Sequence, residues 1–206
     1  YQLLQAGFYK GKEDYKNKCV PLLSRARHNG FESWRPDSLV DDRREANDRT
    51  GGFKTVEDWV RDFSQGGFSC NLDHFYNQDV YLELWFEAEA MSRQFEYYTE
   101  GVTLRPFSGM PSISYKWRIA KDLEHLAGRY YGKPIVILYF GDYDLAGMTI
   151  PETSIADIRG WCFVNFEVIR CGLNDGDAER YKIPENIDKP GSYPWEALND
   201  PTAREL

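Results

Sequence analysis

An unbroken apolar run, Ile135 to Phe140, constrains the fold more than any other feature of this sequence. It begins directly after Lys133-Pro134 and ends at Gly141. A run of this kind is typical of a strand that is buried on both faces, and such strands occur in parallel sheets covered by helices. The run therefore predicts the central strand of an α/β domain.

Alternating patterns around this run favour the same fold. Further strand candidates share β-branched and aromatic residues: Val80–Phe86, Val102–Phe107 and a segment near Phe163–Arg170. Helical patterns separate them: Glu87–Tyr98, Ile113–Leu126 and a segment from about Ala146. This spacing is typical of βαβ units and predicts an α/β fold with a mainly parallel, four-stranded sheet flanked by helices.

The front end of the chain has a different pattern. Glu13–His28 is expected to be a helix that ends at Asn29-Gly30, and Pro21 predicts a kink or a split within it. The polar stretch 31–52 is expected to be a loop or a wing. In Thr55–Phe63, a threonine followed three residues later by an acid predicts a short capped helix.

Composition sets the class of protein. With 42% hydrophobic and 16% aromatic residues, the chain is expected to fold and bury a core. It has no apolar run of the roughly 20 residues that span a membrane, and no signal-peptide pattern. Four scattered cysteines without a CxxC pair favour reduced thiols over a zinc site. We therefore expect a cytoplasmic protein.

Three acidic residues follow strands at the edge where parallel sheets bind ligands. Glu87 comes directly after Val80–Phe86, and Asp142 and Asp144 follow the apolar run within Gly-Asp-Tyr-Asp-Leu-Ala-Gly. Residues two apart in an extended segment point the same way, so both aspartates can face one ion. Converging carboxylates repel one another unless a cation lies among them, and oxygen ligands suit Mg²⁺ or Mn²⁺. The sequence therefore predicts a divalent-metal site.

The Asp-x-Asp pair has competing explanations. Aspartate is common where a strand turns into a loop, because its side chain hydrogen-bonds nearby backbone. A haloacid-dehalogenase phosphatase also places Asp-x-Asp after a buried strand. That family requires Thr or Val where Ala146 stands, however, and it has no use for Glu87.

The order strand–Glu–helix, then strand–Asp-x-Asp–helix, resembles the Toprim domain shared by topoisomerases, primases and related nucleases. Three stretches are more closely similar to a bacterial and phage group related to the topoisomerase VI A subunit: Leu84–Met91, Ser108–Ser114 and Gly141–Gly147. Ile183–Asn186 and Trp195–Leu198 resemble the C-terminal signatures of that group. Residues 1–34 resemble the winged-helix domain that precedes Toprim there.

The resemblance implies a winged-helix-like region at 1–54, a helical connector at 55–78 and a Toprim-like domain at 79–206. It also implies Mg²⁺-dependent phosphoryl transfer at a DNA backbone, as nicking by a nuclease or as topoisomerase-like strand cleavage. Asp142 and Asp144 would hold the metal. Glu87 would act as general acid/base or complete the metal shell.

Three departures from that group leave alternatives open. Ala88 stands where the group usually has lysine, and Leu145 where it usually has proline. The strand-cleaving tyrosine would fall at Tyr1, at the start of what we expect to be an excerpt of a longer chain. Tyrosine and water therefore both remain candidate nucleophiles. A second hypothesis is a Toprim fold kept as a DNA-binding or assembly module without catalysis.

DNA is the expected partner, although the net charge is −8. Residues 1–54 hold 11 Lys/Arg against 8 Asp/Glu, whereas the remaining residues hold 14 against 25. Lys16, Lys18 and Arg25 are the candidates for contacting phosphates. A solvated helix face explains these cations equally well. A homodimer or a partner subunit is also compatible with the sequence.

Trp85 and two tyrosine pairs are expected to have structural roles. Trp85 lies in a predicted strand and is expected to be buried. The pairs Tyr97-Tyr98 and Tyr130-Tyr131 are expected to end helices that pack on the sheet, and not to stack on bases.

Overall fold

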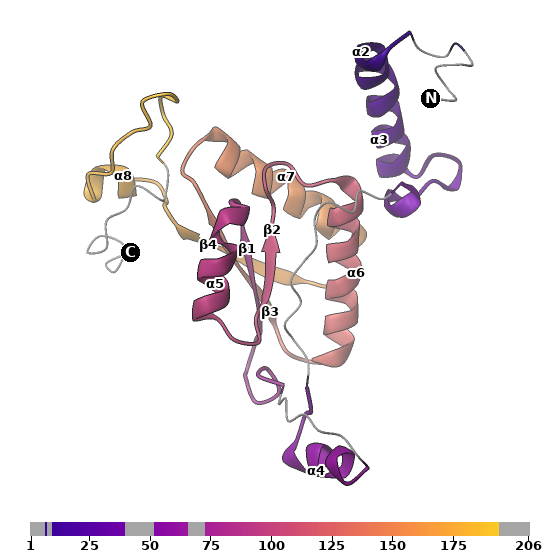
Figure 1. The fold of residues 1–206 in the computed structure, drawn as a ribbon, viewed down its shortest axis with the longest axis vertical. Coiled ribbons are helices and arrows are strands. Elements are labelled where there is room, and N and C mark those ends of the chain that lie inside the picture. Colours follow the sequence, from indigo (N-terminus) through magenta and orange to yellow (C-terminus); the bar gives the residue numbers. More distant parts are fainter. Residues whose placement is uncertain (1–6, 8–9, 40–51, 66–72, 194–206) are drawn as a thin grey trace.

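A computed structural model describes residues 7, 10–39, 52–65 and 73–193 and shows an α/β fold (Figure 1). Its centre is a parallel sheet in the order β2-β1-β3-β4. The strands are β1 (Tyr81–Phe86), β2 (Thr103–Pro106), β3 (Ile135–Gly141) and β4 (Phe166–Gly172). The predicted fold class is confirmed, and the apolar run forms a central strand that pairs with β1.

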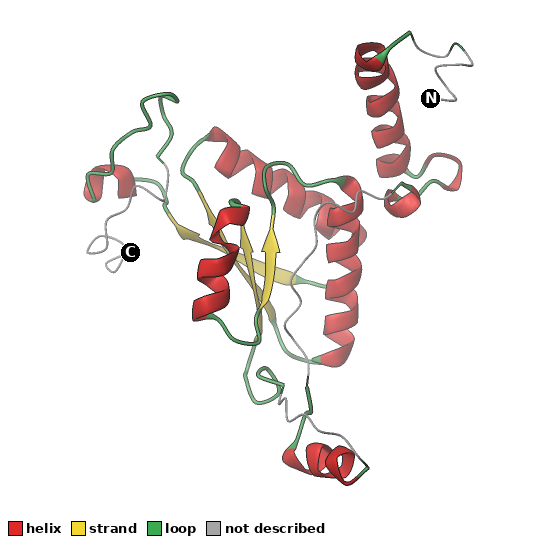
Figure 2. Ribbon diagram, in the orientation of Figure 1, coloured by secondary structure: helices red, strands yellow, loops and turns green. Residues whose placement is uncertain are grey.

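Helices cover both faces of this sheet (Figure 2). α6 (Ile113–Arg129) and α7 (Leu145–Trp161) pack on one face, and α5 (Ser92–Tyr98) packs on the other. After β4 the chain forms the short helix α8 (Asp177–Arg180). The layers are those expected of βαβ units, whose crossover helices lie on the faces of a parallel sheet.

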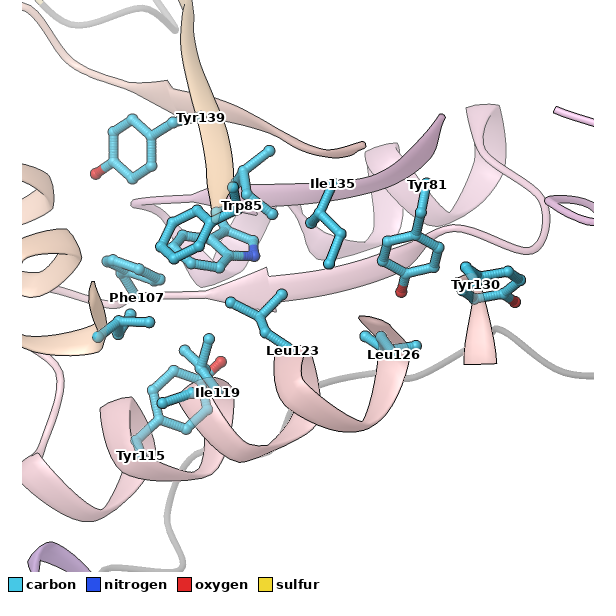
Figure 3. Packing of buried hydrophobic residues seen from close by; sticks show 14 of the residues in the cluster. Tyr81, Trp85, Phe107, Tyr115, Ile119, Leu123, Leu126, Tyr130, Ile135 and Tyr139 are labelled. Atoms are coloured by element: carbon cyan, nitrogen blue, oxygen red, sulfur yellow. The ribbon is translucent and has the colours of Figure 1, made fainter. Parts of the chain in front are cut away.

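The main core lies between the sheet and the helices α6 and α7. In Figure 3, Ile119 and Leu123 project from α6 toward Trp85 of β1, and all three side chains are fully buried. Burying a side chain of this size contributes roughly 1.5–3 kcal/mol. The apolar face of α6 therefore holds this helix against the sheet, and the predicted burial of Trp85 is confirmed.

The two faces of β3 are buried to different degrees, which corrects the expectation drawn from its unbroken apolar run. Ile135, Ile137 and Tyr139 lie in the main core, whereas the alternate residues are half-buried. On the second face, α5 and the 3-10 turn before it, which contains buried Met91, supply the packing. The Phe95 ring of α5 contacts Phe140 at a centroid distance of 5.0 Å. A short helix leaves part of that face accessible.

A buried ion pair joins β1 to β2, and the sequence pattern did not indicate it. Glu83 and Arg105 are both buried, and Arg105 Nε donates to Glu83 Oε2 at 2.7 Å. The Tyr81 hydroxyl and the Trp85 indole N–H also donate to the Glu83 carboxylate. Removing one partner of such a pair typically costs about 3–5 kcal/mol. The network therefore favours one alignment of β1, the strand that leads to Glu87.

The described part of the front end is helical. α2 (Lys12–Asp14), a π-helical turn η1 (Tyr15–Cys19) and α3 (Val20–Asn29) follow one another, and Gly30 ends α3 with a φ of 67°. Pro21 lies in the first turn of α3, where proline is tolerated. The break that Pro21 predicted in the helix is therefore the π-helical turn η1 that precedes α3. The predicted helix and its left-handed cap are confirmed.

The front end contacts the α/β part through α3. His28 Nε2 lies 2.8 Å from Asp157 Oδ1 of α7, and the His28 ring meets the Trp161 ring edge-on at 5.3 Å. The Lys116 ammonium of α6 also donates to Asp157. These contacts join α3 to the two helices that cover the main core.

The expected loop or wing over 31–52 lies only partly within the described residues. Its first part forms two 3-10 turns, η2 (Phe31–Ser33) and η3 (Pro36–Ser38). Residues 40–51 lie outside the described part of the chain. The winged-helix assignment and the domain boundaries therefore stay predictions.

α4 (Val56–Ser64) is the short capped helix that the sequence predicted. The Thr55 hydroxyl oxygen accepts a hydrogen bond from the N–H of Asp58 at 3.1 Å. Val60 and Phe63 on its apolar face are more than half exposed. Figure 1 shows the helix standing apart from the sheet.

Two element boundaries differ from the sequence-based expectation. The helix expected to start at Glu87 begins at Ser92, after the 3-10 turn η4 (Glu89–Met91). The last strand begins at Phe166 instead of near Phe163, because residues 162–165 form the connection between α7 and β4. The first difference matters for the site, since it leaves Glu87 in the connection between β1 and η4, outside any helix.

The two tyrosine pairs lie at the ends of α5 and α6, which pack on the sheet as expected. Tyr97, Tyr98 and Tyr131 are 82%, 80% and 92% exposed, whereas Tyr130 is buried. Each exposed ring lies at or just beyond the end of its helix.

No helix in the described part of the chain is both long enough and apolar enough to cross a membrane. Cys19, Cys162 and Cys171 are free thiols, and Cys70 lies outside the described residues.

Candidate carboxylate site at the sheet edge

The three predicted site residues lie at the carboxyl ends of neighbouring strands. Glu87 follows β1, and Asp142 and Asp144 follow β3, with Phe86 and Phe140 paired across the two strands. The Glu87 N–H donates to the Phe140 carbonyl at 2.9 Å, so Glu87 continues the ladder between them. The sheet therefore brings Glu87 beside the start of the Asp-x-Asp loop, although 54 positions separate Glu87 from Gly141 in the sequence.

Two glycines leave room for the Glu87 carboxylate. A Cβ on Gly147 would lie 3.1 Å from Glu87 Oε2 and 2.2 Å from the Asp142 carbonyl oxygen. A Cβ on Gly141 would lie 3.2 Å from Glu87 Oε2 and 2.8 Å from a ring carbon of Tyr139. Real Cβ atoms do not approach backbone or rings this closely. Glycine at these positions thus permits the loop and the glutamate to approach each other.

Glu87 is a half-buried carboxyl group in a negative environment. Its Oε2 is shielded from solvent and accepts no hydrogen bond from the described residues. Burial raises the pKa of Glu87 above the ordinary value, and the Asp142 carboxylate raises it further. The Asp142 backbone N–H lowers this pKa, Asp144 raises it, and the Arg170 guanidinium lowers it. The net result is a glutamate that holds its proton more tightly than an exposed one.

Asp144 also has a local structural role. Its Oδ1 accepts from the Gly147 N–H at 2.7 Å, which caps the start of α7. Its Oδ2 accepts from the hydroxyl of buried Ser192 at 3.1 Å. Within the described residues, no three His, Cys, Asp or Glu side chains are arranged to hold a metal ion in this conformation. Asp144 is therefore near the other two carboxylates but is directed toward the helix and Ser192.

Arg170 of β4 reaches the same loop, and the sequence analysis did not identify it. Its Nη2 donates to the carbonyls of Gly141 at 3.1 Å and Asp142 at 2.6 Å. Its guanidinium carbon also lies 5.8 Å from the centre of the Tyr139 ring. An arginine near the end of a strand carries no sequence signal for such a contact, because the acceptors are backbone carbonyls.

Tyr139 and the C-terminal loop complete the surroundings. The Tyr139 hydroxyl is buried, has no hydrogen-bond partner among the described residues and lies 3.2 Å from the Cβ position of Gly141. Burial raises its pKa, and the neighbouring Glu87 raises it further. Tyr143, between the two aspartates, pairs with Tyr193 in an antiparallel bridge. This bridge ties the loop to the segment after α8.

A cavity of about 690 Å³ opens beside Asp144. It lies between the first turns of α7 and the loop at 189–192, and Thr149, Lys189 and Ser192 contribute to its wall. Among the described residues of this wall, Asp144 alone carries a carboxylate. The cavity is large enough for a small ligand or for a segment of a larger one.

The predicted phosphate-contacting cations lie in the front end. Lys16, Lys18 and Arg25 are exposed on η1 and α3, and Lys18 forms an ion pair with Asp14 at 2.5 Å. No described contact joins these three cations to the carboxylate site. Figure 1 shows α2 and α3 to one side of the sheet and α8 to the other. Whether these cations contact DNA stays a prediction.

A scan against protein-family models and a search of curated proteins find no match for this chain. The function is therefore argued from the fold and the geometry of the site.

Proposed function

We propose that this chain is a Mg²⁺-dependent enzyme that transfers phosphoryl groups at a DNA backbone, as its resemblance to Toprim proteins implies. The observation that supports this most strongly is the position of Glu87 beside the Asp142–Asp144 loop, at the carboxyl ends of adjacent parallel strands. Ligands of α/β sheets bind at this edge. The glycines at 141 and 147 leave space there that any larger residue would fill.

The donor set fits a hard divalent cation. Carboxylate oxygens are its preferred protein ligands, and a buried carboxylate oxygen without a partner, as on Glu87, suits a cation nearby. Mg²⁺ usually keeps several waters and uses only one or two carboxylates. Asp142 and Asp144 would hold the ion, so the absence of three converging ligands among the described residues is compatible with it. When bound, the ion would neutralise charge that develops on the phosphate.

Glu87 would move a proton at the sugar oxygen. A general acid/base works best when its pKa lies near the operating pH, and the surroundings of Glu87 shift its pKa upward in that direction. Burial keeps water from its Oε2, so a proton held there would pass to a substrate atom placed beside it. Neither a tyrosine nor a water nucleophile is favoured by the described residues.

One observation favours a second function, a DNA-binding or assembly module without catalysis. Both oxygens of Asp144 already accept hydrogen bonds, from Gly147 and from Ser192. A loop aspartate that only caps a helix would show the same contacts. Ala88 and Leu145, which depart from the Toprim group, point the same way.

Cleavage of supercoiled plasmid with Mg²⁺, with Mn²⁺ and with EDTA separates these functions. The enzyme hypothesis expects metal-dependent nicking or relaxation that Glu87→Gln slows by roughly 10²–10⁴-fold, without loss of DNA binding. Glu124→Gln, at a half-buried glutamate on α6 that pairs with Lys121, is the matched control and should cleave like wild type. DNA binding without cleavage in any metal would establish the non-catalytic module. If the wild type binds no DNA at any salt concentration, both functions are excluded.

A further inference from the structure

Arg170 makes a second set of contacts that involves the start of α7. Its Nη1 donates to the Gly147 carbonyl at 3.0 Å, and its Nε donates to the Leu173 carbonyl at 3.2 Å. With its bonds to Gly141 and Asp142, one guanidinium therefore contacts the carbonyls on both sides of the Asp-x-Asp loop. It also ties them to the segment after β4.

The sequence of α7 explains why the Gly147 carbonyl is available. In an α-helix the carbonyl of residue 147 accepts from the N–H of residue 151. Residue 151 is a proline, which lies inside α7 and has no N–H. The Gly147 carbonyl thus lacks its helical donor, and Arg170 supplies one from β4. Pro151 and Arg170 lie on different elements and act on the same carbonyl.

We propose that Arg170 is a positioning residue that holds Asp142 and Asp144 in place by bridging the end of β3 to the first turn of α7. The role rests on the proposed function, since it concerns the geometry of that metal site. The guanidinium binds backbone carbonyls of the loop, so it fixes the loop through its main chain. Removing a residue that orients metal ligands commonly weakens metal affinity by 10–100-fold.

Arg159 provides a matched control on the same face of the sheet. Its Nη2 donates to the Phe166 carbonyl at 3.3 Å, and its guanidinium carbon lies 5.1 Å from the Phe166 ring. It therefore makes the same kinds of contact as Arg170, and none of its described contacts reaches the Asp-x-Asp loop. If arginines packed beside β4 had a purely structural role, removing Arg159 from α7 or Arg170 from β4 would affect metal binding alike.

The test measures Mn²⁺ affinity by electron paramagnetic resonance, with folding checked by circular dichroism. Arg170→Met should bind Mn²⁺ about 10–100-fold more weakly than wild type, whereas Arg159→Met should stay within about twofold. Arg170→Lys should be intermediate, because an ammonium cannot reproduce the guanidinium fork. If wild type binds Mn²⁺ and Arg170→Met binds it equally well, the positioning role is overturned. If wild type itself binds no Mn²⁺, the proposed function is overturned and this role with it.

A double-mutant cycle with Pro151→Ala tests the mechanism and covers the case in which Arg170→Met does not fold. An N–H at position 151 restores the helical donor for the Gly147 carbonyl. The loss of affinity on Arg170→Met should therefore be smaller in the Pro151→Ala background, and the double variant should fold. An equal loss in both backgrounds would overturn the shared-carbonyl explanation.

Discussion

Glu87 Oε2 lies 3.1 Å from the position that a Cβ would occupy on Gly147, so the glutamate takes up the space beside this glycine in the first turn of α7. Gly147→Ala would also bring a Cβ to 2.2 Å from the Asp142 carbonyl oxygen, which belongs to backbone and cannot yield cheaply. We expect this variant to lose about 1–3 kcal/mol in free energy of unfolding, measured by urea denaturation.

Gly160→Ala is the control on the same helix. A Cβ there meets nothing within 4 Å, and alanine favours the helix over glycine by roughly 0.5–1 kcal/mol. The control should therefore be as stable as wild type or more stable. A Gly147→Ala protein as stable as the control would contradict the close contact.

The difference in stability between Glu87→Gln and wild type should depend on pH. The pKa of Glu87 is raised in the folded state above its ordinary value of 4.5. The contribution of the Glu87 carboxyl to the stability of the fold is therefore fully present below pH 4.5. It is lost as the pH rises through the pKa of Glu87 in the folded protein. We expect Glu87→Gln to be more stable than wild type at neutral pH in EDTA, and the difference to disappear toward pH 4.

At neutral pH, Glu124→Gln should change the stability relative to wild type in the opposite direction. The Lys121 ammonium lowers the pKa of Glu124, burial raises it, and the Phe163 N–H lowers it, with a net lowering. That contribution is present above the ordinary pKa and is lost as the pH falls, so the variant should lose stability at neutral pH. Unfolding curves from pH 4 to pH 8 measure both variants. Parallel curves for Glu87→Gln and wild type would refute the raised pKa.

Substitutions at Asp144 separate a ligand from a helix cap. Asparagine caps helices about as well as aspartate, so Asp144→Asn should keep the stability of α7. Asp144→Ala should lose roughly 0.5–2 kcal/mol. If Asp144 binds metal, both variants should lose the rise in melting temperature that Mn²⁺ gives to the folded wild type. If Mn²⁺ raises the melting temperature of Asp144→Asn as much as that of wild type, Asp144 is a helix cap and not a metal ligand.

Lys16→Gln combined with Lys18→Gln tests the expected DNA contacts of the front end. Each lost phosphate contact lowers the slope of log affinity against log salt by roughly 0.9. The double variant should therefore bind DNA more weakly, with a slope smaller by about one to two units. Lys54→Gln, at an exposed lysine outside α2, η1 and α3, is the control. An unchanged slope in the double variant would show that these lysines form only a solvated surface.

Several elements followed from local sequence because their causes are local. The apolar run at 135–140 can avoid water only inside a covered sheet, and residues 87, 142 and 144 follow strands whose ends share one edge. The cap at Thr55 and the left-handed turn at Gly30 depend on one or two residues. Such interactions between near neighbours can be predicted from their spacing.

Only the tertiary structure decided how these parts meet. The pairing of Glu83 with Arg105 depends on which strands are neighbours, and the contact of Arg170 with the Gly147 carbonyl depends on a strand that follows the loop by more than twenty residues. Pro151 is visible in the sequence and leaves a carbonyl without a donor, but the donor comes from another element. Long-range polar contacts to backbone have no residue pattern, because every residue carries the same carbonyl.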